Sequence, residues 1–501
     1  MKTKVYFFLA AILVSVGAYF FIHHSGLHHS LSRMASTALT KQKQGSVKHR
    51  LTVFVHGTFG TVMGFLSLAD VVKDEVQGTA YKKMIAQMRK DPNFYSTQPI
   101  LSRGLTSITP SFNPACVENK KYAAYPLIQA YQTISKEIEE NGTHQDHFYT
   151  FGWSGLISQH RRRMEAIRLY NALAEEVKKF HKQGIEPEIH VVAHSHGGNL
   201  CLNLAAISHI LNTKYISNHT KPSKHDDENE STQKMFEILE TLPHKENALA
   251  YSGQKRFDYL PDIKDFKIDK LMMLGVPVQP ETQYFCASPI FGKVYHFYSD
   301  QDDIQALDCV STKRSFSDKR FDRRVIGAHT KLVQAKVMYD RDLTKSKGLA
   351  KANDFEKNEA PESSLLSKIL NKLFSPLKTN KDPDHKELWF ISWDQENSEP
   401  SSLFPLPTAV IIPLLLKTID IQPLLDIDIN ISTSADKLCI SLTEHGTHVI
   451  KNTNYMPYHV IDRIKQAIKK WKPDSISSKF KFDRLYNLLL KRGPHKKVAF
   501  S

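Results

Sequence analysis

The chain has 501 residues, of which 41% are hydrophobic and 24% are charged, a balance that excludes collagen-like, wholly disordered and multi-span membrane proteins. Its net charge of +15 lies at the two ends: residues 1–50 hold seven Lys/Arg and no Asp/Glu, and residues 461–501 hold twelve against three. The remaining residues hold 48 basic and 49 acidic side chains. This distribution favours contact with an anionic membrane surface over nucleic-acid binding, although a solubilising tail is the alternative for the C-terminal stretch.

The chain begins with an apolar segment. Residues 5–22 follow Met-Lys-Thr-Lys and contain no charge over 18 residues, which is long enough to span a bilayer. We expect residues 1–24 to form an uncleaved single-pass anchor that holds the body on the non-cytoplasmic side of the membrane. The alternative is a cleaved signal of a secreted protein, since residues 15–18 are small. Residues 25–49 then form a basic tether.

Short β-branched runs alternate with helical patterns from residue 51 onward. Strands are expected at 51–55, 148–151, 188–193, 271–274, 294–299 and 331–338. Helical spacing links residues 167–177 and 199–211. This alternation predicts a mainly parallel α/β sheet flanked by helices, whose ligands bind at the carboxyl ends of the strands.

Three segments interrupt the pattern and are expected to be insertions: 61–147, 217–231 and 341–384. After a stretch at 410–416 that Pro413 interrupts, residues 427–431 and 438–442 predict a hairpin, and Val460, Ile461, Ile464, Ile468 and Trp471 predict one face of a helix. Residues 416–501 are therefore read as a C-terminal α+β extension with a basic end. We expect 331–338 to be the last parallel strand, with the hairpin extending or covering the sheet edge.

The segment Val191–Asn199 (VVAHSHGGN) places a serine between a predicted strand and a predicted helix. Small residues stand two positions before and after Ser195, at Ala193 and Gly197, as the tight turn of a nucleophile elbow requires. Ala193 replaces the glycine of the usual GxSxG pattern. Ser195 is therefore the predicted nucleophile.

A second glycine-containing loop, His56-Gly57-Thr58-Phe59-Gly60, follows the first predicted strand. Acyl transfer passes through a tetrahedral oxyanion that needs two backbone N–H donors. One donor follows the nucleophile, and the other comes from a loop after an earlier strand. These donors are expected at His196 and Thr58, with His56 and Gly57 supporting the loop.

With VFVHGTFG, FGWSGLISQHRRR, VVAHSHGGN and LMMLGVPVQPET in this order, the sequence resembles the α/β-hydrolase superfamily, and its lipase and serine-esterase branch in particular. The resemblance covers residues 50–340, with a weaker part to 415, and implies a hydrolase domain at 50–415. It also implies a catalytic triad in the chain order Ser, Asp, His.

The acid of the implied triad is expected after the strand at 294–299. Asp302 has the family-like placement, and Asp303 and Asp300 are the alternatives. Its carboxylate would accept a hydrogen bond from the histidine and stabilise the imidazolium.

The histidine is expected after Asp302 and near the end of a strand. His385 follows the strand at 331–338 once the insertion is removed, and its HKELW surroundings resemble the histidine loop of lipases. His445 and His448, after the later hairpin strand, and His329 are the alternatives.

These features predict a membrane-associated serine hydrolase that cleaves carboxylic esters, lipid esters in particular, with Ser195, His385 and Asp302 as its triad. An acyltransferase or thioesterase with the same triad is one alternative. An inactive hydrolase fold that serves as a membrane-tethered interaction module is another. HExxH, P-loop and GxGxxG motifs are absent from the sequence, so we expect no metal and no cofactor.

Overall fold

The structure is a computed structural model that describes residues 47–58, 100–108, 122–139, 144–156, 158–215, 230–235, 237, 266–302, 317–326, 331–340, 382–383, 385, 388–389, 407–421, 424–433 and 437–471. The chain divides into one unit of Met1–Lys48 with Thr143–Gln145 and a second unit of His49–Gly142 with Asp146–Ser501. The fold described below is that of the second unit. The segment 5–22, residues 59–99, the loop 217–229 and residues 341–381 lie outside the described residues.

The second unit is built on a ten-stranded sheet in the order β10-β9-β8-β7-β6-β5-β4-β1-β3-β2. The strands are β1 (Lys48–Val55), β2 (Gly104–Ile108), β3 (His144–Gly152), β4 (Glu188–His194), β5 (Ile268–Leu274), β6 (Phe291–Tyr298), β7 (Leu332–Asp340), β8 (Asp426–Thr433), β9 (Lys437–Glu444) and β10 (Ile450–Pro457). Five neighbouring pairs from β1 to β8 are parallel, and the pairs β2–β3, β8–β9 and β9–β10 are antiparallel. The predicted α/β class and all six predicted strands are confirmed.

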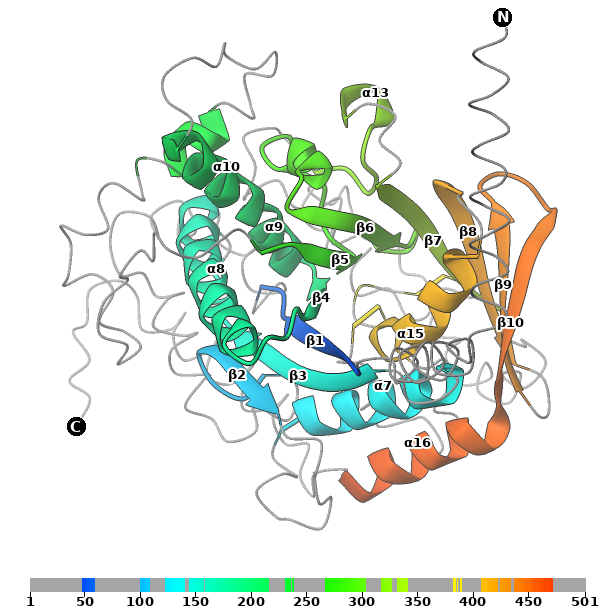
Figure 1. Cartoon of the computed structure of the whole chain (residues 1–501). Helices are drawn as coiled ribbons and strands as arrows, with labels where there is room; N and C mark the ends of the chain where they lie inside the picture. The colour runs from blue at the N-terminus through cyan, green and yellow to red at the C-terminus, as the bar shows by residue number, and fades with distance from the viewer. Residues whose placement is uncertain are drawn as a thin grey trace, which may run out of the picture. The chain divides into compact units, whose positions relative to one another are not determined.

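Helices cover both faces of the sheet (Figure 1). One face packs against α8 (Gln159–His181), α9 (His196–Leu202), α10 (Leu204–Tyr215) and the 3₁₀-helix η4 (Gln283–Ala287). The other face packs against α7 (Ala124–Ile138), α15 (Thr408–Ile419) and α16 (Tyr458–Trp471). Side chains along β4 alternate between the two cores, with Val191 and Ala193 on the α8 face and Val192 on the α7 face. This alternation fixes the register of β4 and therefore the position of the residue that follows it.

One prediction about the C-terminal part of the sheet is wrong. β7 is not the last parallel strand, because β8 pairs with it in parallel, with Gln334 opposite Asp426. A parallel pair needs a crossover connection, and α15 supplies one by running as a helix through Pro413 on the α7 face of the sheet. The predicted hairpin is present as β8 and β9 and extends the sheet edge. The expected domain boundary at 415/416 falls inside α15, and the residues after it add strands to the same sheet.

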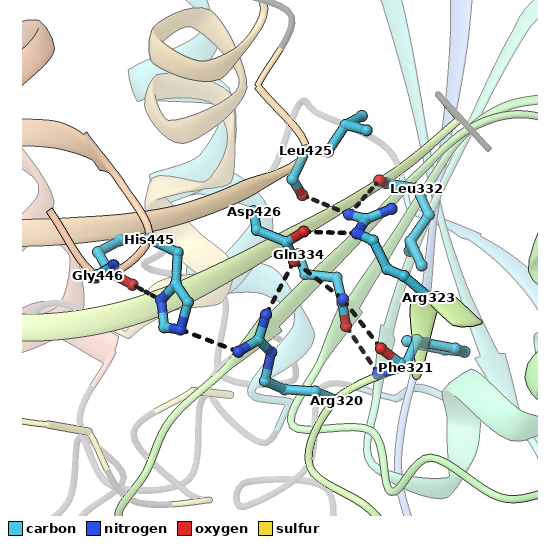
Figure 2. Close-up of polar contacts among 10 residues, drawn as sticks. Arg320, Phe321, Arg323, Leu332, Gln334, Leu425, Asp426, His445 and Gly446 are labelled. Atoms are coloured by element: carbon cyan, nitrogen blue, oxygen red, sulfur yellow. Dashed lines mark hydrogen bonds and ion pairs between the residues drawn. The ribbon is translucent and has the colours of Figure 1, made fainter. Parts of the chain in front are cut away.

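A polar cluster joins the segment 317–326, which includes α13 (Arg323–Ile326), to strands β7 and β8 (Figure 2). Asp426 accepts hydrogen bonds from Arg320, at 3.0 Å, and from Arg323, at 2.5 Å. Gln334 donates from Nε2 to the same carboxylate and exchanges hydrogen bonds with the backbone of Phe321. The cluster ties three separate parts of the chain together at the β7–β8 junction.

Among the residues that the structure describes, no helix is both long and apolar enough to cross a membrane. The expected anchor at residues 5–22 lies outside them, and so do the alternative site residues Asp303 and His329.

Candidate active site

Ser195 occupies the turn between β4 and α9, as its strand and helix patterns predict. Its backbone has φ 51° and ψ −135°, and within the described part of the chain it is the only non-glycine residue with positive φ. Such a conformation costs on the order of 1–3 kcal/mol and persists only where neighbouring contacts hold it. Here the Ser195 N–H donates to the carbonyl of Leu274 on β5 at 2.9 Å, and its own carbonyl accepts from the Gly198 N–H at 2.9 Å.

The small residues around Ser195 have no room for side chains. A Cβ added to Gly197 would collide with the carbonyl oxygen of His56, and one added to Gly198 would collide with the side chain of Val276. Ala193 is fully buried. The tight packing of α9 against the ends of β1 and β5 explains why this turn needs small residues, and the methyl group of Ala193 is accommodated.

The loop after β1 is held by Trp153, which follows β3. The Trp153 backbone N–H donates to His56 Nε2 at 3.1 Å, so His56 carries its proton on Nδ1 and donates to the Gly57 carbonyl at 2.7 Å. The indole Nε1–H donates to the His56 carbonyl at 2.7 Å, and the two rings stack with centroids 5.4 Å apart. Trp153, in the FGWSG motif, therefore holds the loop of residues 56–58 in place, which we call the HGT loop.

The HGT loop lies directly against the nucleophile. A Cβ added to Gly57 would stand only 2.7 Å from Ser195 Cβ. Thr58 follows Gly57 and His196 follows Ser195, so the two residues expected to donate to an oxyanion come from segments in contact with each other. The Thr58 hydroxyl is buried and has no hydrogen-bond partner among the described residues.

Asp302 and His385 meet although 83 residues separate them. His385 Nδ1 lies 2.7 Å from Asp302 Oδ2, with Asp302 fully buried and His385 5% exposed. The loop at Asp302 turns through a hydrogen bond from its N–H to the carbonyl of Ser299, at the end of β6. Because Nδ1 faces the carboxylate, Nε2 is the nitrogen that remains to face a reacting group.

Two elements connect this pair to Ser195. Gly275, next to the Leu274 carbonyl that holds Ser195, has φ 57°, and a Cβ added to it would lie 2.7 Å from Asp302 Oδ2 and 3.1 Å from His385 Nδ1. His194, the residue before Ser195, lies with its ring centroid 4.5 Å from that of His385. The structure therefore brings the acid and the histidine against the residues that flank the nucleophile.

The alternative site residues are placed elsewhere. His445 and His448 are exposed at the end of β9 and in the turn that follows it. His445 Nδ1 lies 2.5 Å from Asp428 Oδ1, and Nε2 accepts from Arg320 at 3.0 Å (Figure 2). Asp300 is exposed and forms an ion pair with Lys336 at 2.5 Å. None of these side chains has a contact with Ser195 or His385 among those that the described residues make.

Sequence reasoning did not single out Gly275 or Trp389 as site residues. The sequence does offer a signal for Gly275. This glycine directly follows the strand beside the nucleophile strand, and a glycine in such a place often marks where another part of the chain approaches the backbone closely. Trp389 is fully buried and stacks on His194, with centroids 5.1 Å apart and planes 7° apart. Its place in the site depends on a contact between residues 195 positions apart in sequence, which no local pattern signals.

Across the described ranges, no group of three or more His, Cys, Asp or Glu side chains is arranged to hold a metal ion. The buried thiols of Cys201 and Cys286 have pKa values raised by burial, to about 12 for Cys286, which makes them poor nucleophiles. Comparison of the chain with protein-family models and with the sequences of curated proteins gives no match.

Proposed function

We propose that this protein is a serine hydrolase of the α/β-hydrolase fold that cleaves carboxylic esters. The observation that carries the proposal is the buried His385–Asp302 hydrogen bond, which lies against the strained turn that presents Ser195. A buried carboxylate that orients a histidine near a serine is the arrangement by which a serine hydroxyl becomes a nucleophile.

In the proposed mechanism, Ser195 Oγ attacks the acyl carbon while His385 Nε2 takes the hydroxyl proton. Asp302 holds the histidine tautomer and stabilises the imidazolium that forms. The backbone N–H groups of Thr58 and His196 donate to the oxyanion. The imidazolium then protonates the leaving alcohol, and water, activated by His385, releases the acid from the acyl enzyme.

The order of the residues supports the α/β-hydrolase assignment. Ser195 follows β4, Asp302 follows β6 and His385 comes after β7, all at or beyond the carboxyl ends of parallel strands. Ligand sites of open parallel sheets lie at this edge. The chain order Ser, Asp, His is that of the fold family.

A lipid ester is the proposed substrate class, and a membrane is the proposed location. Support comes from the uncharged residues 5–22 and from the basic ends of the chain. This part of the proposal rests on sequence alone, because those residues lie outside the described part of the structure.

Hydrolysis of p-nitrophenyl esters of short and long acyl chains tests the proposal. Wild type should hydrolyse them, and Ser195→Ala should lower kcat by at least about three orders of magnitude with nearly unchanged Tm. Ser208→Ala, which removes another buried serine hydroxyl on α10, is the matched control and should keep wild-type kcat. A folded Ser195→Ala protein with most of the activity would contradict the assignment, and acyl transfer to an added alcohol without free acid would indicate the acyltransferase.

A further inference from the structure

We propose that His194, the residue before the nucleophile, is the positioning residue that holds the general base in line with Ser195. This inference rests on the proposed function and names a role that the triad itself does not include. His194 is 4% exposed and ends strand β4, so its backbone is fixed by the sheet.

The ring of His194 touches three parts of the site. Its Nε2 lies 3.0 Å from the backbone carbonyl oxygen of His385, and because a carbonyl only accepts, Nε2 carries the proton and donates. One face stacks on Trp389, and its centroid lies 4.5 Å from that of the His385 ring. A Cβ added to Gly57 would lie 3.1 Å from Nδ1, so the ring also borders the HGT loop.

These contacts complement the Asp302 bond. A hydrogen bond at Nδ1 alone lets an imidazole swing about that bond, which moves Nε2 away from a nucleophile. His194 fixes the backbone of His385 from a second direction, and its partner Trp389 comes from the same segment as His385. Two anchors, one on the ring and one on the backbone, set the direction of Nε2.

The charge state of His194 suits this role. Burial, with the neighbouring His385 as a further cause, holds the pKa of His194 well below its ordinary value, so the ring stays neutral. The general base becomes an imidazolium during the reaction, and a second positive ring beside it would oppose that step. A neutral donor holds His385 without this repulsion.

Three substitutions separate positioning from structural support. His194→Phe keeps an aromatic ring for the Trp389 stack and loses the donor. His194→Gln keeps an N–H donor near the position of Nε2. His190→Phe is the matched control, because His190 lies on the same strand, is equally buried, and bonds Glu188 away from the site.

The experiment measures kcat, KM and Tm of the full chain on p-nitrophenyl esters. His194→Phe should lower kcat about 10- to 100-fold with KM changed less than about twofold, as expected for a misplaced base. His194→Gln should recover most of the lost kcat, and His190→Phe should keep wild-type kcat even if its Tm falls. His194→Asn, which is too short to reach the carbonyl, should match the phenylalanine variant and replaces it if that variant does not fold.

The inference is overturned if folded His194→Phe or His194→Asn keeps the wild-type kcat. It is also overturned if His194→Gln is as slow as the phenylalanine variant. In either case the proposed function stands. A wild-type protein without esterase activity overturns both.

Discussion

Ser195 and Gly275 both have positive φ, and each stands directly after a strand, β4 and β5 respectively. At Ser195 the strain presents the hydroxyl, and at Gly275 the missing Cβ leaves space for the Asp302–His385 pair. Gly275 also donates its N–H to the carbonyl of Phe297 at 2.9 Å, so it is fixed between β5 and β6. Single residues thus set the distances on which the proposed chemistry depends.

Gly275→Ala should therefore lower kcat by far more than backbone strain at this position would. The new Cβ would displace Asp302 or His385, and kcat should fall about 100-fold. Gly184→Ala is the control: it has φ 72° with open space around it, so it should cost about 1–2 kcal/mol of unfolding free energy and leave kcat unchanged. Kinetics and urea unfolding of both variants check this, and equal kcat for the two would contradict the packing argument.

His385→Ala should lower kcat by about three to five orders of magnitude, because it removes the proposed general base. His445→Ala removes the histidine of a second His–Asp pair, with Asp428, and should change kcat less than about twofold. Steady-state kinetics of both variants make the comparison. A large loss in His445→Ala with none in His385→Ala would move the site to the end of β9 and the turn after it.

From the sequence, Asp302 and His385 were the first choices for the acid and the histidine, but Asp300, Asp303, His329, His445 and His448 stayed open as alternatives. Asp300 and Asp302 share one loop and one local pattern, but Asp302 is fully buried against His385 while Asp300 is exposed and paired with Lys336. Burial of this kind depends on the approach of a segment more than 80 residues away, and local patterns carry no information about it. The elbow was predictable because its requirements, a strand, small residues and a helix, are all local.

At the scale of elements, the segment 317–326 supports the loop that carries the proposed acid. Lys319 Nζ donates to the carbonyl of Asp300 at 2.6 Å, and Arg320 lies over the ring of Tyr298, at the end of β6. The same segment is anchored to β8 through Asp426 (Figure 2). The C-terminal strands thus contribute to the stability of the α/β core and are more than an appendage.

Asp426→Asn should lower the unfolding free energy by about 1–3 kcal/mol, because it leaves Arg320 and Arg323 without their shared carboxylate. The effect stays below that of a fully buried pair, since these side chains are between 22% and 38% exposed. Asp322→Asn, in the same segment, breaks the exposed ion pair with Arg324 and should leave the unfolding free energy nearly unchanged. Urea unfolding of both variants tests the contrast, and equal losses would refute it.

The prediction that β7 is the last parallel strand failed for a physical reason. A β-branched run after a helix containing proline can join a sheet either as a hairpin or through a crossover, and the difference lies in how the preceding segment packs. Because α15 is buried along almost its whole length on the α7 face, it acts as a crossover and delivers β8 parallel to β7. The strands β2 and β10 were not predicted at all, since their sequences alternate weakly and both lie at sheet edges.

Across the whole molecule, several buried histidines are neutral. Burial lowers the pKa of His190 and His194 and lowers that of His296 to about 3. The unfolded chain protonates these rings near pH 6.5, whereas the folded chain does not, so the unfolded state binds more protons below that pH. The contribution of these neutral rings to the unfolding free energy is therefore fully present above about pH 6.5 and is lost as the pH falls.

His296 alone should lower the unfolding free energy by about 1 kcal/mol between pH 6.5 and 5.5, and His190 and His194 should add to this loss. Burial raises the pKa of Asp382, so this one carboxyl group favours the folded state as the pH falls, opposite to the histidines. Urea unfolding at pH 7.5, 6.5 and 5.5 measures the change, and His296→Leu should reduce the loss between pH 6.5 and 5.5 by about 1 kcal/mol. A constant unfolding free energy over this range would show that these rings are not buried and neutral.

The most direct test of the account is covalent labelling of the folded full-length chain with a fluorophosphonate, followed by mapping of the modified peptide by mass spectrometry. Only a serine activated by a neighbouring base reacts quickly with this probe. We expect one label per chain, on Ser195, with labelling lost in Ser195→Ala and slowed at least about 100-fold in His385→Ala. A folded wild-type chain that takes no label, or one labelled at another serine, would contradict it.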